Sequence, residues 1–189
     1  PELLDWLATE LMRDDWSQKQ IHRLILLSAA YRMSAEKPDD QLTNATDPNN
    51  ILLSRMPIKR LEGEVIRDSI LDLSGRMDDR LYGPSVPIAL NAFQDGRGKP
   101  GVSGPIDGAG RRSLYLSVRR NFAESFLTAF DLPNPHTSMG RRNVSNVPAQ
   151  ALALLNSPMV IEQAQLWAER SLRASPSLSV TARIDELYQ

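Results

Sequence analysis

The chain has 189 residues, a hydrophobic fraction of 41% and a formal net charge of −1. A chain of this length buries roughly 70% of its unfolded surface, so we expect a folded core without disulfides or bound metal. The charge argues against a general nucleic-acid or anionic-membrane binder, no apolar run approaches the ~20 residues of a membrane span, and the lack of cysteine excludes disulfides, a thiol nucleophile and CxxCH haem attachment within the chain.

Two helices are expected at the start of the chain. Leu3, Leu7 and Leu11 recur every four residues, which places them on one helix face. The following segment SQKQIHRLILLSAAYRM opens with Ser17 and Gln20, the pattern of a capping box. The DDW sequence between the two segments predicts a turn, and therefore a helical hairpin.

A polar loop and a third helix are expected next. Residues 37–50 are polar and contain two prolines, which is typical of a loop. Apolar residues at helical spacing predict a helix from Ile58 to Met77. Gly63 inside this helix costs about 1 kcal/mol relative to alanine, so we expect a close helix crossing there.

The second half begins with an irregular segment. Residues 83–110 hold 7 of the 10 glycines and 4 of the 13 prolines, which predicts a long irregular insertion. The sequence SLYLSV at 113–118 alternates like a strand, and it either pairs within the glycine-rich segment or is simply extended. Phe122, Phe126 and Phe130 then predict a short helix.

Prolines mark the remaining helices. Residues 147–156 predict a buried helix with Leu152 and Leu155 in the core, because apolar side chains occupy nearly every turn. Pro158 is expected to begin the next helix, which reaches about Arg173, and a last helix starts near Ser179.

These elements predict a mainly α fold with a minor β element. We expect a single domain over residues 1–189, made of about six or seven helices with the Gly/Pro-rich segment 83–110 inserted. The sequence starts at proline without an initiator methionine and stops within the pattern TARIDELYQ. We therefore expect a fragment of a longer multidomain protein.

Arginine is the most distinctive residue type, with 18 arginines against 4 lysines. Arginine forms planar, bidentate pairs with carboxylate, sulfate or phosphate groups. Three arginine pairs lie between residues 111 and 142, and either they bind acids within the domain or they form a pocket for an anionic group. The candidates for such an anion-binding or structural site are Arg111, Arg112, Arg119, Arg120, Arg141, Arg142, Asn143 and His136.

The pair Arg141 and Arg142 precedes a predicted helix start, where free backbone amides already favour an anion. We predict that at least one of the two arginines makes a bidentate contact. Its partner is an aspartate or glutamate of the chain in the structural case, and a bound anion in the functional case.

Other chemistry is weakly indicated. No metal site is expected, since the two histidines His22 and His136 are far apart, and His22 is predicted to pack beside an apolar stripe. Glu62, Glu64 and Asp68 lie among interleaved cations in KRLEGEVIRDSI, which favours salt bridges, although paired carboxylates also occur in glycosidases. The glycines lack the P-loop spacing.

Several long segments carry a family resemblance: SAAYRMS, DPNNILLSRMPIKRLEGEVIRDSILDLSGRMD, RRSLYLSVRRN and GRRNVSNVPAQALALLNSPMVIEQAQLWAERSL. They resemble the planctomycete-type domain of unknown function 1553, the C-terminal domain of multidomain proteins that often carry a cytochrome-c-like haem domain. The resemblance covers nearly the whole chain. It implies an exported, periplasmic or cell-envelope protein and assigns no catalytic residue.

The resemblance also sets expectations about partners and function. It implies a sister domain of the same polypeptide as partner and haem c in a neighbouring domain. No cofactor is expected in this chain itself, since it has no cysteine and only two separated histidines. We expect a non-catalytic interaction or scaffold module, with no nucleic-acid partner and no membrane span in this chain. The alternative is part of an enzyme that acts on an anionic carbohydrate, such as a sulfated or carboxylated polysaccharide.

Overall fold

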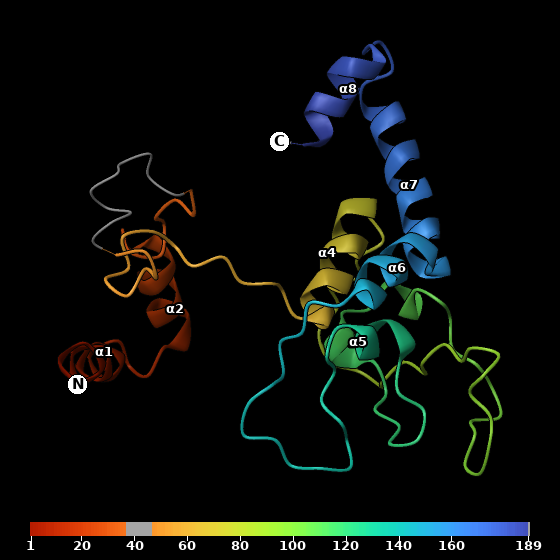
Figure 1. The fold of residues 1–189 in the computed structure, drawn as a ribbon, viewed down its shortest axis with the longest axis horizontal. Coiled ribbons are helices and arrows are strands. Elements are labelled where there is room, and N and C mark those ends of the chain that lie inside the picture. The colour runs from red at the N-terminus through yellow and green to blue at the C-terminus, as the bar shows by residue number, and fades with distance from the viewer. Residues whose placement is uncertain (37–46, 189) are drawn as a thin grey trace. The chain divides into compact units, whose positions relative to one another are not determined.

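The computed structural model describes residues 1–36 and 47–188. The chain divides into two compact units, Pro1–Lys59 and Arg60–Gln189 (Figure 1). Among the described residues the first unit holds two α-helices and the second holds five, which confirms the mainly α fold. The prediction of a single domain stays a prediction, and most of the expected loop at 37–50 lies outside the described residues.

The first unit contains a helical hairpin, as predicted. Helix α1 (Glu2–Arg13) and helix α2 (Gln18–Leu27) are joined by a turn with two residues in the left-handed region. The capping box is absent: the Ser17 hydroxyl makes no cap hydrogen bond, because the Gln20 amide donates to the Ser17 carbonyl instead. The predicted packing role of His22 is also wrong, since this residue is exposed.

In the second unit, helix α4 (Gly63–Ser74) is shorter than predicted. It begins at Gly63 because Glu62 is extended, with ψ at 153°, and it ends where Gly75 adopts the left-handed conformation with φ at 76°. The apolar residues before position 63 are therefore outside the helix and exposed. The buried face of α4 consists of Gly63, Arg67, Leu71 and Ser74.

The core of the second unit forms where two helices pack against α4. Helix α5 (Ser125–Ala129) and helix α7 (Pro158–Ala174) both pack against α4 (Figure 1). A Cβ atom on Gly63 would lie 2.8 Å from the Cβ of Phe130, which confirms the predicted close helix crossing. The core cluster is Phe126, Leu127, Phe130 and Met159.

The proline-marked boundaries are confirmed. Helix α6 (Pro148–Asn156) is separated from α7 by one residue, and Pro158 is the first residue of α7. Helix α8 (Val180–Leu187) is capped by the Ser179 hydroxyl, which accepts a hydrogen bond from the Ala182 amide at 3.2 Å.

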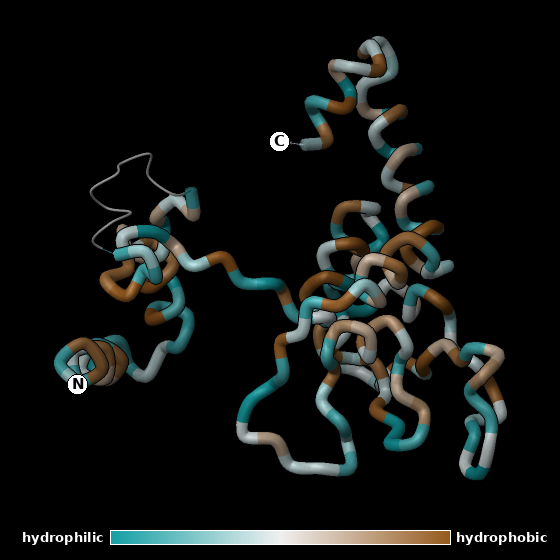
Figure 2. Tube along the Cα trace, viewed as in Figure 1, coloured by the Kyte–Doolittle hydropathy of each residue, from teal (hydrophilic) through white to brown (hydrophobic). Residues whose placement is uncertain are grey.

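The predicted core position of the α6 leucines is wrong. Leu152 is 58% exposed and Leu155 is 72% exposed, because only the opposite face of α6, with Gln150 and Ala153, turns toward the rest of the unit. Most of α6 nevertheless has the brown and pale colours of apolar residues (Figure 2). The helix therefore presents an apolar face that nothing in the described structure covers.

The Gly/Pro-rich segment 83–110 is irregular, as predicted. The stretch 113–118 begins with the short 3₁₀ turn η2 (Ser113–Tyr115), so it is not a strand from its first residue. Its β character is a single parallel bridge between Leu116 and Val86, which agrees with the first of the two alternatives, pairing within the glycine-rich segment.

None of the described helices is both long and apolar enough to cross a membrane.

Candidate functional site

A cleft of about 610 Å³ lies in the second unit between α4, residues 112–119 and the loop that precedes α6. Apolar side chains, among them Ile88, Leu116, Leu127 and Leu132, form much of its surface. Four carboxylates and three arginines also line it, which leaves one net negative charge when all are ionised. We call it the charged cleft, and its charged residues are Glu62, Glu64, Asp68, Arg112, Arg119, Glu124 and Arg142.

Arg142 makes the predicted bidentate contact with a carboxylate of the chain. Its Nη1 and Nη2 atoms donate to the two carboxylate oxygens of Glu64, each at 2.8 Å, and Nη1 also donates to Glu62 at 2.9 Å. The hydrogen bonds from Arg142 lower the pKa of Glu64 below its ordinary value of 4.5, and they raise the pKa of Arg142. Both Nη atoms of Arg142 are therefore engaged by carboxylates of the chain itself.

Asp68 of α4 binds the segment at Ser113 that forms another wall of the cleft. Its Oδ1 atom accepts hydrogen bonds from the amide and the hydroxyl of Ser113, both at 2.7 Å. Its Oδ2 atom lies 3.6 Å from Nε of Arg112, whose side chain is 51% exposed. The salt-bridge interpretation of Glu62, Glu64 and Asp68 is thus the one that the geometry supports. Arg142 and Arg112 come from distant segments, whereas Arg67, 3.4 Å from Asp68, is one of the interleaved cations.

Arg111 lies outside the cleft and is buried. Its guanidinium stacks on the ring of Tyr115 at 4.0 Å and donates to the carbonyl of Tyr82 at 2.7 Å. The neighbouring Arg67 of α4 is 2% exposed and donates to the carbonyls of Arg111 at 3.0 Å and Asp107 at 2.8 Å. Burial lowers the pKa of Arg67. Both arginines hold irregular backbone in place.

The remaining candidates are dispersed. Arg119 lines the cleft and makes no ion pair or side-chain hydrogen bond with any residue in the ranges 1–36 and 47–188. Arg120, Arg141 and His136 are exposed and do not line the cleft, and Asn143 lines a separate small pocket beside Asp131. The structure thus brings together Arg112, Arg119 and Arg142, and leaves the other five candidates elsewhere.

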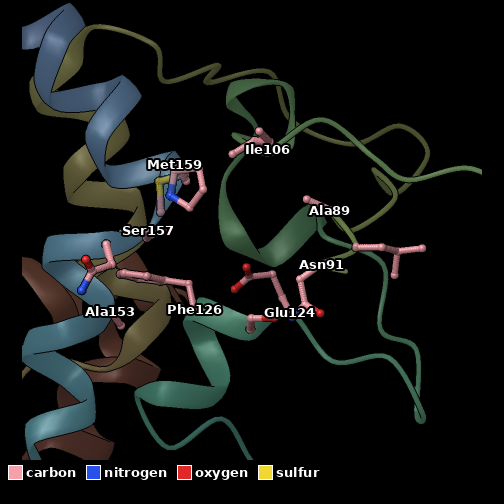
Figure 3. Close-up of a pocket in the computed structure, with 12 residues that line it drawn as sticks. Ala89, Asn91, Ile106, Glu124, Phe126, Ala153, Ser157 and Met159 are labelled. Atoms are coloured by element: carbon pink, nitrogen blue, oxygen red, sulfur yellow. Dashed lines mark hydrogen bonds between the residues drawn. The ribbon is translucent and has the colours of Figure 1, made fainter. Parts of the chain in front are cut away.

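Glu124 is a functional candidate that the sequence reasoning missed. Its Oε2 atom accepts a hydrogen bond from the Leu127 amide at 2.7 Å and so caps α5. Its position shortly before the apolar pair Phe126–Leu127 is the sequence signal for such a cap. The carboxylate also borders a second pocket, of about 400 Å³, between α5 and the start of α7, and Figure 3 shows it directed into that space.

Residues 1–189 match the family model PSD1, which is described as a protein of unknown function (DUF1553). The chain belongs to this family. No curated protein and no solved structure matches the PSD1 chain. The expected association with planctomycetes and with a cytochrome-c-like domain stays a prediction, as does every functional role of the arginines.

The charge balance of the cleft decides which chemistry suits this PSD1 chain. Glu64 and Asp68 are engaged by donors of the chain, and two of the three cleft arginines face carboxylates. A pocket for a sulfate or phosphate group needs cations whose donors are available to the ligand. Among the described residues no group of three or more histidine, aspartate or glutamate side chains is placed to hold a metal ion. The cleft is therefore poorly suited to a sulfate or phosphate group, since Arg119 is the one cleft arginine that faces no carboxylate of the described residues.

Proposed function

We propose that the chain is a non-catalytic interaction module of a multidomain cell-envelope protein, and that it packs against a sister domain of the same polypeptide through α6. The supporting observation is the exposure of Leu152 and Leu155 on a helix that is apolar on nearly every side. Helices with this character are normally buried on all faces.

The two leucines and Ala151 form one face of α6, opposite the side that carries Gln150 and Ala153. We call this set the α6 face. Complete burial of a leucine contributes about 1.5–3 kcal/mol, so covering the exposed parts of both leucines would contribute roughly 2–4 kcal/mol. That is enough to add substantially to binding, but a stable complex needs further contacts around it.

The enzyme alternative, acting on an anionic carbohydrate, has less support. Hydrolysis of a glycosidic bond requires two carboxyl groups that are available to substrate across a cleft. Glu64 is held in a bidentate ion pair and Asp68 accepts two hydrogen bonds from Ser113. Neither carboxylate is placed to act on a substrate without first breaking contacts that hold the fold.

The proposed context includes a neighbouring cytochrome-c-like domain that carries haem c. Covalent haem attachment requires cysteines, and this chain has none, so haem would belong to the neighbour. In this arrangement the module would position the electron-carrying domain and would not itself exchange electrons.

The proposal is tested by measuring association between this chain and the sister domain encoded in the same gene, using isothermal titration calorimetry. Leu155→Asp should weaken binding at least about tenfold, since it places a charge in the interface. The matched control is Gln165→Asp, which adds the same charge at an exposed position of α7 and should bind normally. No measurable association of the unmodified chain at tens of micromolar, or equal binding by both variants, would contradict the proposal.

A further inference from the structure

The chain next to the charged cleft has an unpaired backbone edge. The Val86 amide donates to the Tyr115 carbonyl at 2.8 Å, and the Val86 carbonyl accepts from the Ser117 amide at 2.8 Å. One side of the segment 115–117 is therefore paired with Val86. Neighbouring residues of an extended segment direct their backbone groups to opposite sides. The carbonyl of Leu116, which is extended with ψ at 138°, is therefore directed away from Val86.

The unpaired groups continue along the segment. The Leu116 carbonyl and both backbone groups of Val118 have no hydrogen-bond partner within residues 1–36 and 47–188. Leu116, Ser117 and Val118 all line the charged cleft. The Leu116 amide is already paired with the Ser113 carbonyl at 3.1 Å, so the free groups are one amide and two carbonyls. Such unpaired groups beside a cavity are a short template for the addition of a strand from another chain. We call residues 116–119 the cleft edge.

The side chains around the cleft edge suit an extended segment with apolar residues. The cleft wall beside it is apolar at Ile88, Leu127 and Leu132. Val118 is 83% exposed, so it is available to pack against an added strand. In strand addition the backbone hydrogen bonds supply affinity and pockets for alternate side chains supply specificity.

The charges at the cleft edge indicate the sign of the charge that a partner should carry. Arg119 and Arg120 are exposed and form no ion pair with a described residue. Three of the four cleft carboxylates, in contrast, are engaged by Arg142, Arg112 and Ser113, and the fourth, Glu124, accepts a hydrogen bond from the Leu127 amide. The positive charge that remains available is thus next to the edge, where an acidic side chain would complement it.

We propose that the cleft edge binds an extended, apolar and acidic segment of another protein by strand addition. The backbone of the segment pairs with Leu116 and Val118, an apolar side chain enters the charged cleft, and an acidic residue faces Arg119. This inference rests on the proposed interaction role, because it gives the module a partner of stated chemistry, but it uses a surface different from the α6 face.

The test uses a fluorescein-labelled peptide of alternating valine and threonine residues that ends in two aspartates, with fluorescence anisotropy as the readout. The full chain should bind it saturably with a Kd below about 1 mM. A peptide with the same side chains and N-methylated backbone amides should not bind, because it cannot form the ladder. A peptide that ends in two lysines should bind at least about threefold more weakly.

Two pairs of variants locate the site. Val118→Pro removes one backbone donor and should weaken binding about tenfold, while Val118→Ala keeps that donor and should change binding less than about threefold. Arg119→Glu should weaken binding of the aspartate peptide and strengthen binding of the lysine peptide. This exposed change keeps the test informative even if the proline variant fails to fold, which circular dichroism would reveal.

The outcomes separate the two proposals. Leu155→Asp should leave peptide binding unchanged. If the sister domain binds and the peptide does not, the strand-addition inference is wrong and the interaction role stands. Absence of saturable binding, equal binding of the N-methylated peptide, or no effect of Arg119→Glu overturns the inference.

Discussion

Replacing Arg67 with methionine tests how the Gly/Pro-rich segment is attached to α4. The side chain is 2% exposed, and its guanidinium donates to the carbonyls of Asp107 and Arg111 at 2.8 and 3.0 Å. Methionine has a similar length and can fill the space, but it donates no hydrogen bond. The substitution therefore removes the attachment with little change in packing.

The expected magnitude follows from the two hydrogen bonds that Arg67 makes to these carbonyls. The Arg111 carbonyl loses its described partner, whereas the Asp107 carbonyl keeps the hydrogen bond from the Gly110 amide at 3.2 Å. A hydrogen bond from a charged group contributes roughly 1.5–3 kcal/mol, so the loss of two costs roughly 3–6 kcal/mol. Removing a buried cation offsets part of this cost, since burial disfavours the charged guanidinium. We expect Arg67→Met to lower the free energy of unfolding of the second unit by about 3 kcal/mol.

Urea unfolding followed by tryptophan fluorescence measures this change. Trp6 and Trp16 are first replaced by phenylalanine, so that Trp167 of α7 reports on the second unit alone. A loss of about 3 kcal/mol moves the midpoint down by about 1–3 M urea. Arg112→Met is the control and should cost less than about 1 kcal/mol, because that side chain is half exposed. A loss below 1 kcal/mol for Arg67→Met, with an unchanged slope, would refute the attachment.

Three further predictions concern other contacts of the second unit. Since the pKa of Glu64 is lowered by Arg142, this carboxylate stabilises the fold above its ordinary value of 4.5 and loses that contribution as the pH falls through the lowered pKa. Glu64→Gln should therefore flatten the acid side of a plot of unfolding midpoint against pH; an unchanged slope contradicts this. Gly63→Ala should lower the free energy of unfolding by about 1–3 kcal/mol in thermal unfolding, because the new Cβ would lie 2.8 Å from the Cβ of Phe130. This clash outweighs the gain of about 1 kcal/mol in helix propensity from alanine. A stabilised variant would show that the helices separate easily. Phe130→Ala should lower the free energy of unfolding of the isolated chain by about 3–5 kcal/mol, because Phe130 is buried. Leu155→Ala should lower it by less than about 0.5 kcal/mol, because Leu155 is exposed. Similar losses at the two positions would show that the α6 face is covered.

Local signals in the sequence predict most of the element boundaries. Pro158 begins α7 and Ser179 caps α8 because proline and a capping serine act through their own backbone geometry. Gly63 similarly indicates a close crossing, since only the absence of a side chain permits it. The bidentate contact of Arg142 follows from the chemistry of arginine, but its partner Glu64 is 78 residues away and no local rule identifies it.

The errors have a common physical cause. Periodicity shows which residues share a helix face, but it does not show what covers that face. The α6 leucines share an apolar face that remains exposed, so their predicted burial is wrong. Arg67 shows the reverse case, because a charged residue on the inner face of α4 is buried by carbonyls from a distant irregular segment. Gly63, Arg67, Leu71 and Ser74 are spaced so that they share one face of a helix. Hydrophobic periodicity does not identify this face as buried, because only Leu71 is apolar.

The hydrogen bond between Ser74 of α4 and Gln163 of α7 joins residues 89 positions apart, which has a consequence for biosynthesis. A ribosome that adds about 5–20 residues per second needs roughly 4–18 seconds to make the intervening chain. During that interval α4 has already been made, and Leu71, fully buried in the finished fold, still lacks α7. The Arg67 contact to the Arg111 carbonyl spans only 44 residues, so it can form on the nascent chain first and cover part of α4 while α7 is still being synthesised.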